Sequence, residues 1–312
     1  FITAALSVFR YQYENNKVYH RFCNLLHRSP HNVHTLEDIP FLPIHFFKTE
    51  KVYCSDTPHQ EIFTSSGTTG AQTSQHYVKD LSIYQESFRK GFQHFYGDVH
   101  NYTILALLPS YLERQGSSLI TMTDDLIRQS QSEESGFYLH NYDHLAATLQ
   151  RLDKAGGQVL LIGVSFALLS LVEQYTFQLK NTIVMETGGM KGKRKELIRE
   201  ELHQLLKEGF GVPHIHSEYG MTELLSQAYS SGEGIYRSVP WMKILIRDTN
   251  DALSYLPTGK TGGVNVIDLA NIHSCSFIST QDLGKLHPDG SFEILGRFDN
   301  TDLRGCNLMV SL

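Results

Sequence analysis

A short segment rich in hydroxyls and glycine, 64–70, contains the residue types that most directly indicate chemistry. It has the sequence Thr-Ser-Ser-Gly-Thr-Thr-Gly and follows the apolar pair Ile62-Phe63. Glycines allow positive φ and bring backbone N–H groups close to a ligand, and such groups together with hydroxyls can surround a polyphosphate. A Walker A loop is excluded, because no Gly-Lys-Ser/Thr follows the four-residue gap. The segment therefore predicts a nucleotide phosphate site, with a polar surface turn as the alternative.

A second segment, 216–223, combines an aromatic ring, a glycine and an acid after a short expected strand. It has the sequence His-Ser-Glu-Tyr-Gly-Met-Thr-Glu. The ring of Tyr219 can stack on a base, and Gly220 leaves room for a nucleotide. Glu223 can ligate Mg²⁺, which prefers one or two carboxylates together with phosphate oxygens. The alternative is a helix N-terminus, where the dipole favours acidic residues.

Two side chains in the last third, Asp282 and Arg297, are of types that bind a ribose. A carboxylate accepts hydrogen bonds from both ribose hydroxyls, and a guanidinium binds hydroxyl or phosphate oxygens bidentately. Each residue alone is equally typical of a surface turn or ion pair. His214 and His216 would share one face of a strand, but they lack the further ligands of a metal site.

The elements expected to position these segments alternate along the chain. We expect a helical N-terminal segment over 1–60, an α/β core over 61–231 and a β-rich subdomain over 232–300. Alternating strands and helices are typical of a mostly parallel sheet packed with helices. The expected strands of the core are 76–78, 102–108, 159–162 and 182–186, and its expected helices are 81–95, 118–129, 142–154, 168–175 and 193–207. Asp80 is the expected N-cap of the first of these helices.

Composition restricts the class of protein. The 312 residues include 41% hydrophobic and 19% charged residues, as in ordinary globular proteins. The net charge of −6 provides no electrostatic basis for broad binding to nucleic acid or to an anionic membrane. No apolar run reaches the length of a membrane span. Four dispersed cysteines without a C-x-x-C pair favour reduced thiols in a cytoplasmic enzyme.

The order and spacing of these segments resemble those of AMP-forming adenylating enzymes over about residues 62–305. Three segments indicate a narrower family within this superfamily. They are IPFLPI at 39–44, TSQHYV at 73–78 and LLPSYLERQGSSL at 107–119. Together they most resemble the acyl-protein synthetase family, which includes the fatty-acid-activating subunit of bacterial bioluminescence. The next most similar group is the phenylacetate-CoA ligase branch. The resemblance implies the large N-terminal domain of that superfamily, with mixed, mostly parallel sheets and a β-rich subdomain, and with the small C-terminal domain largely absent. It implies that the core over 61–231 binds ATP and the acyl group, and that 301–312 is the hinge and the start of the missing C-terminal domain.

The resemblance also implies roles for single residues. The β- and γ-phosphates of ATP would be held by Ser65, Ser66, Gly67, Thr68, Thr69 and Gly70. The adenine pocket would include Gly188, Gly189, Tyr219, Gly220 and Met221. Thr222 and Glu223 would serve the α-phosphate and Mg²⁺, and Asp282 would bind the ribose hydroxyls. Arg297 would act with Thr222 and Glu223 in catalysis, Asp299 would be the hinge, and 109–119 would border the acyl pocket.

The implied activity is ATP-dependent, AMP-forming activation of a fatty or aromatic carboxylic acid, followed by transfer of the acyl group to a protein cysteine or CoA. Its cofactors would be ATP and Mg²⁺, and a reductase or acyltransferase subunit is a further expected partner. Two alternatives stay open: a catalytically impaired nucleotide-binding subunit, and a nucleotidyltransferase that leaves AMP on its product. The first is motivated by Ala71-Gln72 where many members have Pro-Lys, and by a chain that stops at Leu312, before the family's lysine-bearing small domain.

Overall fold

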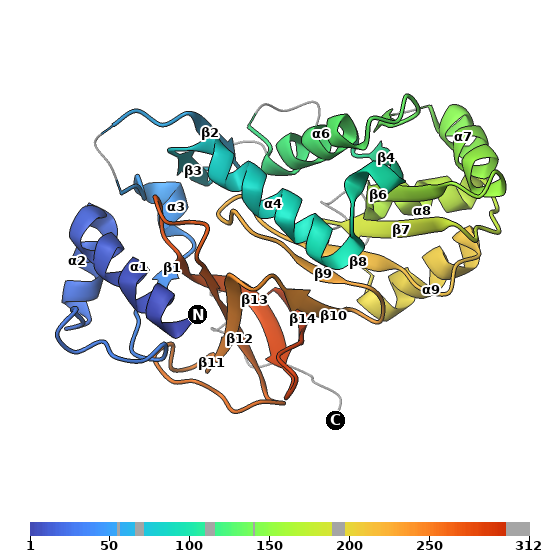
Figure 1. The fold of residues 1–312 in the computed structure, drawn as a ribbon. Helices are drawn as coiled ribbons and strands as arrows, with labels where there is room; N and C mark the ends of the chain where they lie inside the picture. The colour runs from blue at the N-terminus through green and yellow to red at the C-terminus, as the bar shows by residue number, and fades with distance from the viewer. Residues whose placement is uncertain (55–56, 66–71, 110–115, 140, 189–196, 298–312) are drawn as a thin grey trace.

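The central sheet of this computed structural model places five parallel strands side by side (Figure 1). The structure describes residues 1–54, 57–65, 72–109, 116–139, 141–188 and 197–297. The parallel strands are β4 (Tyr102–Leu107), β5 (Gly136–Phe137), β6 (Gln158–Val164), β7 (Thr182–Thr187) and β8 (His216–Tyr219). They lie in the order β8-β7-β6-β4-β5, so the chain crosses over through a helix between neighbours. This parallel pairing, together with the buried apolar runs of β4 and β6, confirms the mostly parallel α/β fold predicted from the sequence.

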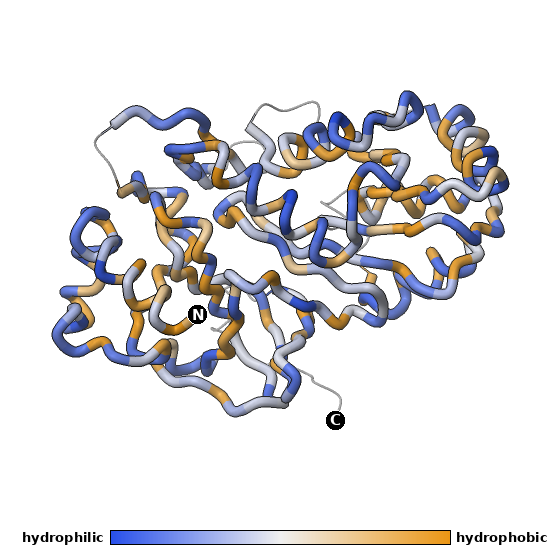
Figure 2. Tube along the Cα trace, viewed as in Figure 1, coloured by the Kyte–Doolittle hydropathy of each residue, from blue (hydrophilic) through white to orange (hydrophobic). Residues whose placement is uncertain are grey.

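Helices cover both faces of this sheet. They are α4 (Leu81–Tyr96), η1 (Val99–Asn101), α6 (Ser118–Ser130), α7 (Tyr142–Lys154), α8 (Ser165–Gln174) and α9 (Arg199–Phe210). The side chain of Asp80 accepts a hydrogen bond from the N–H of Ser82, which confirms it as the N-cap of α4. Arg89 on α4 forms a bidentate ion pair with Asp125 on α6, at 2.7 and 2.6 Å. Hydrophobic residues are concentrated along the central strands (Figure 2).

The start of α8 differs from the prediction. The sequence pattern placed this helix at 168–175, whereas it begins at Ser165, immediately after Val164 ends β6. Val164 provides no side-chain cap. Instead, Ser165 Oγ donates toward Glu186 Oε2 and the carbonyl oxygen of Gly188, both at 3.1 Å. Strand and helix are therefore joined without the turn residues from which a helix start is usually recognised.

Antiparallel strands continue the same sheet from β8. They are β9 (Ala228–Ser230), β10 (Ile235–Ser238), β11 (Met242–Arg247), β12 (Thr261–Asp268), β13 (Phe277–Leu286) and β14 (Phe292–Arg297). The order is β11-β12-β13-β14-β10-β9-β8, so the β-rich region predicted for the last third is hydrogen-bonded to the core through β9 and β10. The sheet thus changes from parallel to antiparallel pairing between β8 and β9.

The N-terminal helices pack on the β-rich strands rather than on the parallel core (Figure 1). This segment comprises α1 (Ile2–Asn15), α2 (Lys17–Leu25), β1 (Leu42–Pro43) and α3 (Phe46–Thr49). The ring of Phe277 lies 6.4 Å from that of Phe9 and is stacked at 6.0 Å on that of Tyr19. β1 pairs in parallel with β13. A separate hairpin of β2 (Glu61–Thr64) and β3 (Gln75–Val78) follows, and it confirms the short strand expected after the glycine-rich segment.

Candidate nucleotide site

The glycine-rich segment forms the connection of the β2–β3 hairpin. Its two ends are held together, because the N–H of Ser65 donates to the carbonyl of Ser74 at 3.1 Å and the N–H of Ser74 donates to Ser65 Oγ at 2.9 Å. Gly116 fixes the hairpin from outside by accepting the N–H of Thr64 at 2.8 Å. Gly116 has φ +74°, and a Cβ there would lie 2.9 Å from the carbonyl oxygen of Ile62. Of the predicted phosphate contacts, Ser65 is described, while Ser66, Gly67, Thr68, Thr69 and Gly70 lie outside the described residues.

The backbone after β8 is held by the last residue of β12 and by the turn that follows it. The carboxylate of Asp268 is fully buried and accepts the N–H groups of Leu225 at 2.7 Å and Ser226 at 3.0 Å. Asn271 Nδ2 donates to the carbonyl oxygen of Glu223 at 2.8 Å. Two side chains from a distant turn therefore fix the segment that carries the predicted magnesium and phosphate contacts.

Glu223 itself is buried, with 5% of its surface exposed. Burial raises the pKa of its carboxyl group, while a hydrogen bond with Ser74 and the positive charges of Arg297 and Lys48 act in the opposite direction. Ser74 is the residue that closes the glycine-rich connection against Ser65. The structure therefore brings the carboxylate predicted to bind Mg²⁺ to the base of the predicted phosphate loop.

Tyr219, Asp282 and Arg297 also meet. The hydroxyl of Tyr219 donates to Asp282 Oδ2 at 2.7 Å, and Arg297 Nε lies 3.5 Å from Asp282 Oδ1. Asp282 on β13 is directly opposite Arg297 on β14 in the strand register. Burial raises the pKa of the Asp282 carboxyl group, against the lowering effects of the Tyr219 hydrogen bond and of Arg297 and Arg247. A buried acceptor beside a partly exposed guanidinium is the arrangement expected for a pair that binds ribose hydroxyls.

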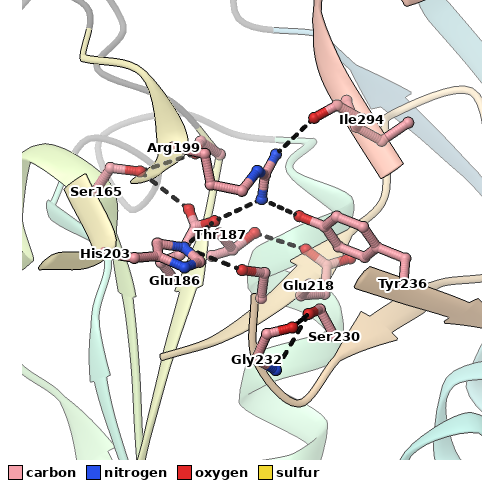
Figure 3. A network of polar contacts seen from close by, with 12 residues as sticks. Ser165, Glu186, Thr187, Arg199, His203, Glu218, Ser230, Gly232, Tyr236 and Ile294 are labelled. Atoms are coloured by element: carbon pink, nitrogen blue, oxygen red, sulfur yellow. Dashed lines mark hydrogen bonds and ion pairs between the residues drawn. The ribbon is translucent and has the colours of Figure 1, made fainter. Parts of the chain in front are cut away.

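A buried polar network lies at the carboxyl ends of β7 and β8 (Figure 3). Glu186 accepts from Ser165 Oγ at 3.1 Å and from Arg199 Nη1 at 3.3 Å, with His203 Nε2 3.6 Å away. Burial raises the pKa of Glu186, but the hydrogen bond with His203 and the charge of Arg199 outweigh it, so that the pKa is lowered overall. Arg199 also donates to the hydroxyl of Tyr236 at 2.5 Å, and it thereby connects the parallel core to β10.

The opposite face of the same strands carries a second buried acid, Glu218. Its Oε2 accepts from Thr187 Oγ1 at 2.6 Å. Burial raises the pKa of Glu218 to about 7, although the Thr187 hydrogen bond lowers it. A Cβ on Gly220 would lie 2.4 Å from Glu218 Oε1, so a larger residue at this position would displace the Glu218 carboxylate.

The remaining predicted residues are placed less fully. Gly188 has φ +64° and its carbonyl accepts from Ser165, while Met221 is half-buried against the β-rich core. Gly189, Asp299 and the central part of 109–119 lie outside the described residues. Within the described ranges no group of three or more His, Cys, Asp or Glu residues could hold a metal ion. A single carboxylate, Glu223, still fits Mg²⁺, which takes its other ligands from phosphate and water.

Sequence reasoning missed His76. This side chain on β3 is fully buried, with Nδ1 2.8 Å from the carbonyl oxygen of Thr222 and Nε2 2.9 Å from Asn271 Oδ1. Burial lowers the pKa of His76 to about 4, against the raising effect of both hydrogen bonds. Its partners are 146 and 195 residues away in the chain, so the local pattern around His76 contained no signal of these contacts.

Known proteins resemble the chain along its whole length. A family model described as "Acyl-protein synthetase, LuxE" matches residues 1–312. Two long-chain-fatty-acid–luciferin-component ligases are similar over 97% of this chain and 85% of their own length, at 25% identity for Vibrio harveyi and 23% for Aliivibrio fischeri.

In the described part of the chain, no helix is long and apolar enough to cross a membrane.

Two solved structures share the fold. An open conformation of 2-hydroxyisobutyryl-CoA ligase, in complex with 2-HIB-AMP and CoA, matches with a TM-score of 0.68 at 12% identity, over 96% of this chain and 74% of that one. ATP-bound MatB from Rhodopseudomonas palustris matches with a TM-score of 0.57 at 17% identity, over 76% of this chain. The match spans about half, 47%, of the length of MatB. At these identities the likeness concerns the fold alone.

Proposed function

This chain belongs to the acyl-protein synthetase family, and from that premise we propose that it activates a long-chain fatty acid with ATP and passes the acyl group to a protein thiol. The substrate class follows the names of the two bacterial ligases that it resembles. The observation that carries the proposal is the convergence of Glu223, the loop base at Ser65 and Ser74, and the Asp282–Arg297 pair around the end of β8. These are the groups that hold a nucleoside triphosphate by its metal, its phosphates and its ribose.

In the first step a carboxylate oxygen of the fatty acid attacks the α-phosphorus of ATP in line. The new O–P bond forms as the bond from the α-phosphorus to the bridging oxygen of pyrophosphate breaks, which leaves an acyl-adenylate. The protein contributes orientation and fixed donors for the phosphate charge that develops. Glu223 would hold Mg²⁺, which neutralises phosphate oxygens when bound. Thr222 would contact the α-phosphate.

Asp282 and its partners orient the ribose in this proposal. The Asp282 carboxylate accepts from Tyr219 through Oδ2, and its Oδ1 faces Arg297. A ribose hydroxyl would approach from the side of Arg297, whose side chain is 71% exposed, because the Tyr219 side is closed by packing. Tyr219 thus has a role beyond the predicted stacking on adenine, since its hydroxyl orients the carboxylate.

In the second step a thiolate attacks the acyl carbonyl and AMP leaves. We propose that this thiol belongs to a partner protein in the cytoplasm, such as a reductase or acyltransferase subunit. The three described cysteines, Cys23, Cys54 and Cys275, are all buried. Burial raises the pKa of both Cys23 and Cys54 to about 12, which leaves them without useful thiolate at neutral pH. Cys306 lies outside the described residues.

Pyrophosphate exchange with the full-length protein tests the first step. Labelled pyrophosphate should enter ATP in the presence of long-chain fatty acids, and less with aromatic or short acids. Asp282→Asn should weaken ATP binding roughly ten-fold or more, because a hydrogen bond to a charged group contributes about 1.5–3 kcal/mol. Asp289→Asn is the matched control, since Asp289 pairs with Arg237 in an exposed turn. The proposal fails if no carboxylic acid supports exchange while ATP binds normally.

The same reaction mixtures separate the two alternative functions. A ligase releases AMP and leaves the acyl group on the acceptor, whereas a nucleotidyltransferase leaves AMP on its product, and mass spectrometry distinguishes the two. A catalytically impaired subunit binds ATP without exchange. Transfer of a labelled fatty acid to a cysteine of a candidate partner protein, abolished by alkylating that cysteine, tests the second step.

A further inference from the structure

His76 connects the hairpin that carries the glycine-rich loop to the segment that carries Glu223. It lies on β3, two residues after Ser74, and is fully buried. Its Nδ1 is 2.8 Å from the carbonyl oxygen of Thr222, the residue that immediately precedes Glu223. The ring is enclosed by Phe47 and Phe63, with ring centroids 5.7 and 6.5 Å away. The imidazole is therefore fixed in position and cannot turn to another partner without disturbing the core.

Asn271 fixes the other side of the ring. Its Nδ2 donates to the carbonyl oxygens of Glu223 and Cys275, at 2.8 and 2.9 Å. A flipped amide would place Oδ1 against both carbonyl oxygens, so the orientation of Asn271 is determined. Its Oδ1 is then an acceptor for His76 Nε2 at 2.9 Å. Both ring nitrogens of His76 thus face acceptors, but burial lowers the pKa of His76 to about 4, so the neutral ring has one N–H, and with that proton on Nδ1 it donates to the carbonyl oxygen of Thr222.

A second contact also connects the β2–β3 hairpin to the Thr222–Glu223 segment, but it is made to Glu223, the predicted metal ligand. The side chain of Ser74 is close enough to the carboxylate of Glu223 to lower the pKa of that carboxyl group. Binding of Mg²⁺ by that carboxylate competes for the oxygen lone pairs that Ser74 uses. The His76 contact is made instead to the main chain of Thr222, so it is independent of what Glu223 binds. Of these two links, the one through His76 is able to persist when Glu223 is occupied.

We propose that His76 is a positioning residue for adenylation, which holds the loop hairpin in register with Thr222 and Glu223 through its Nδ1 contact while ATP and Mg²⁺ are bound. This inference rests on the proposed function. It assigns His76 no contact with substrate. Its effect is to keep the β2–β3 hairpin and the Thr222–Glu223 segment at a fixed separation, on which in-line attack at the α-phosphorus depends.

Two substitutions distinguish a positioning role of His76 from a contribution of its ring to core packing alone. Asn at position 76 places an amide nitrogen near the position of Nδ1, whereas Gln places one near the position of Nε2. His76→Asn therefore retains the Thr222 contact and loses that to Asn271, while His76→Gln does the reverse. Each loses one polar contact of the buried ring and part of the ring volume, so the two should have similarly lowered melting temperatures.

The expected functional results differ between the two variants. In pyrophosphate exchange with the full-length protein, kcat/KM for MgATP should fall about ten-fold in His76→Gln and less than about two-fold in His76→Asn, as expected for one lost hydrogen bond. KM for the fatty acid should be unchanged in both. Arg89→Met, which breaks the α4–α6 ion pair, is the control for lost stability and should leave kcat/KM for MgATP unchanged well below its melting temperature. Equal losses in both His76 variants, or losses that follow melting temperature, would overturn the proposal.

Calorimetric binding of MgATP keeps this test separate from the test of the proposed function. If wild-type protein binds ATP but no acid supports exchange, the ligase proposal fails, whereas a weaker affinity in His76→Gln than in His76→Asn still supports the positioning role. If wild-type protein binds no ATP, the positioning role is overturned too. If a variant does not fold, amide hydrogen exchange of the wild-type protein tests the proposal instead. MgATP should protect the amides of 75–78 and 222–226 together. Protection of one segment alone would contradict a coupling of the two segments through His76.

Discussion

Replacing Tyr219 by Phe removes one oxygen from the centre of the candidate ribose site. The ring retains its edge contacts with Tyr236 and Phe292, both at centroid distances of 6.0 Å. The lost group is the donor that lies 2.7 Å from Asp282 Oδ2, in a residue with 8% of its surface exposed. A hydrogen bond to a buried charged group contributes about 1.5–3 kcal/mol. We therefore expect Tyr219→Phe to lower the free energy of unfolding by about 2 kcal/mol at pH 7.5.

The difference in unfolding free energy between wild type and Tyr219→Phe should depend on pH. The folded-state pKa of Asp282 is raised mainly by burial, and the Tyr219 hydrogen bond acts to lower it. The variant raises that pKa further. A raised carboxyl pKa favours the folded state at low pH, where the group is protonated in both states, and this advantage is lost as pH rises through the folded-state pKa. The difference between wild type and variant should therefore be largest at pH 7.5 and should shrink toward pH 4.5.

Urea unfolding at pH 7.5, 6.0 and 4.5 measures this difference, with the m value unchanged between wild type and variant. Tyr13→Phe is the matched control, because its hydroxyl donates to Asn24 at an exposed site. A loss below about 0.5 kcal/mol at pH 7.5, which is the size typical of a surface substitution, would refute the reasoning. A loss of the same size at all three pH values would show that Asp282 is not the group concerned.

Three further results are expected. Arg199→Met should lower the free energy of unfolding by about 3 kcal/mol in urea titrations, because it leaves the buried carboxylate of Glu186 without its guanidinium partner. Gly116→Ala should destabilise the protein by more than Gly97→Ala in thermal unfolding: both have positive φ, but a Cβ on Gly97 meets nothing within 4 Å. Between pH 6 and 8, the unfolding free energy of wild-type protein should fall relative to that of Glu218→Gln, since the raised folded-state pKa of about 7 stabilises the folded state only while Glu218 is protonated.

The family and the fold class could be predicted from the sequence because their signals are local. The strand at 102–108 is a short run of apolar residues between turn residues, and β4 occupies Tyr102–Leu107. The family was recognised from the order of several short motifs, and the family model confirms it. The partners of Tyr219 and Asp282 were not predictable at the level of single atoms, although both residues were chosen for the same nucleotide.

The missed contacts have a common physical reason. His76, Asp268 and Asn271 act on backbone groups far away in the chain, and ordinary polar residues carry no sequence mark of such partners. The amphipathic N-terminal helices are a second case, because their pattern indicates a buried face without indicating what covers it. Here the covering surface is the last antiparallel region of the sheet, which includes Phe277.

The docking of the N-terminal helices on β13 has a consequence for synthesis. Gln12 is fully buried, and its amide contacts the carbonyl oxygen of Asn271 and the hydroxyl of Ser276. Ser276 lies 264 residues after Gln12, so at the usual rates of translation, about 5–20 residues per second, α1 is synthesised roughly 13–53 s before this partner. During that interval the apolar face of α1 around Phe9 has no native surface to cover it. The helix that is synthesised first is thus among the last to reach its final position, and a nascent chain interrupted before β13 is a natural client for chaperones.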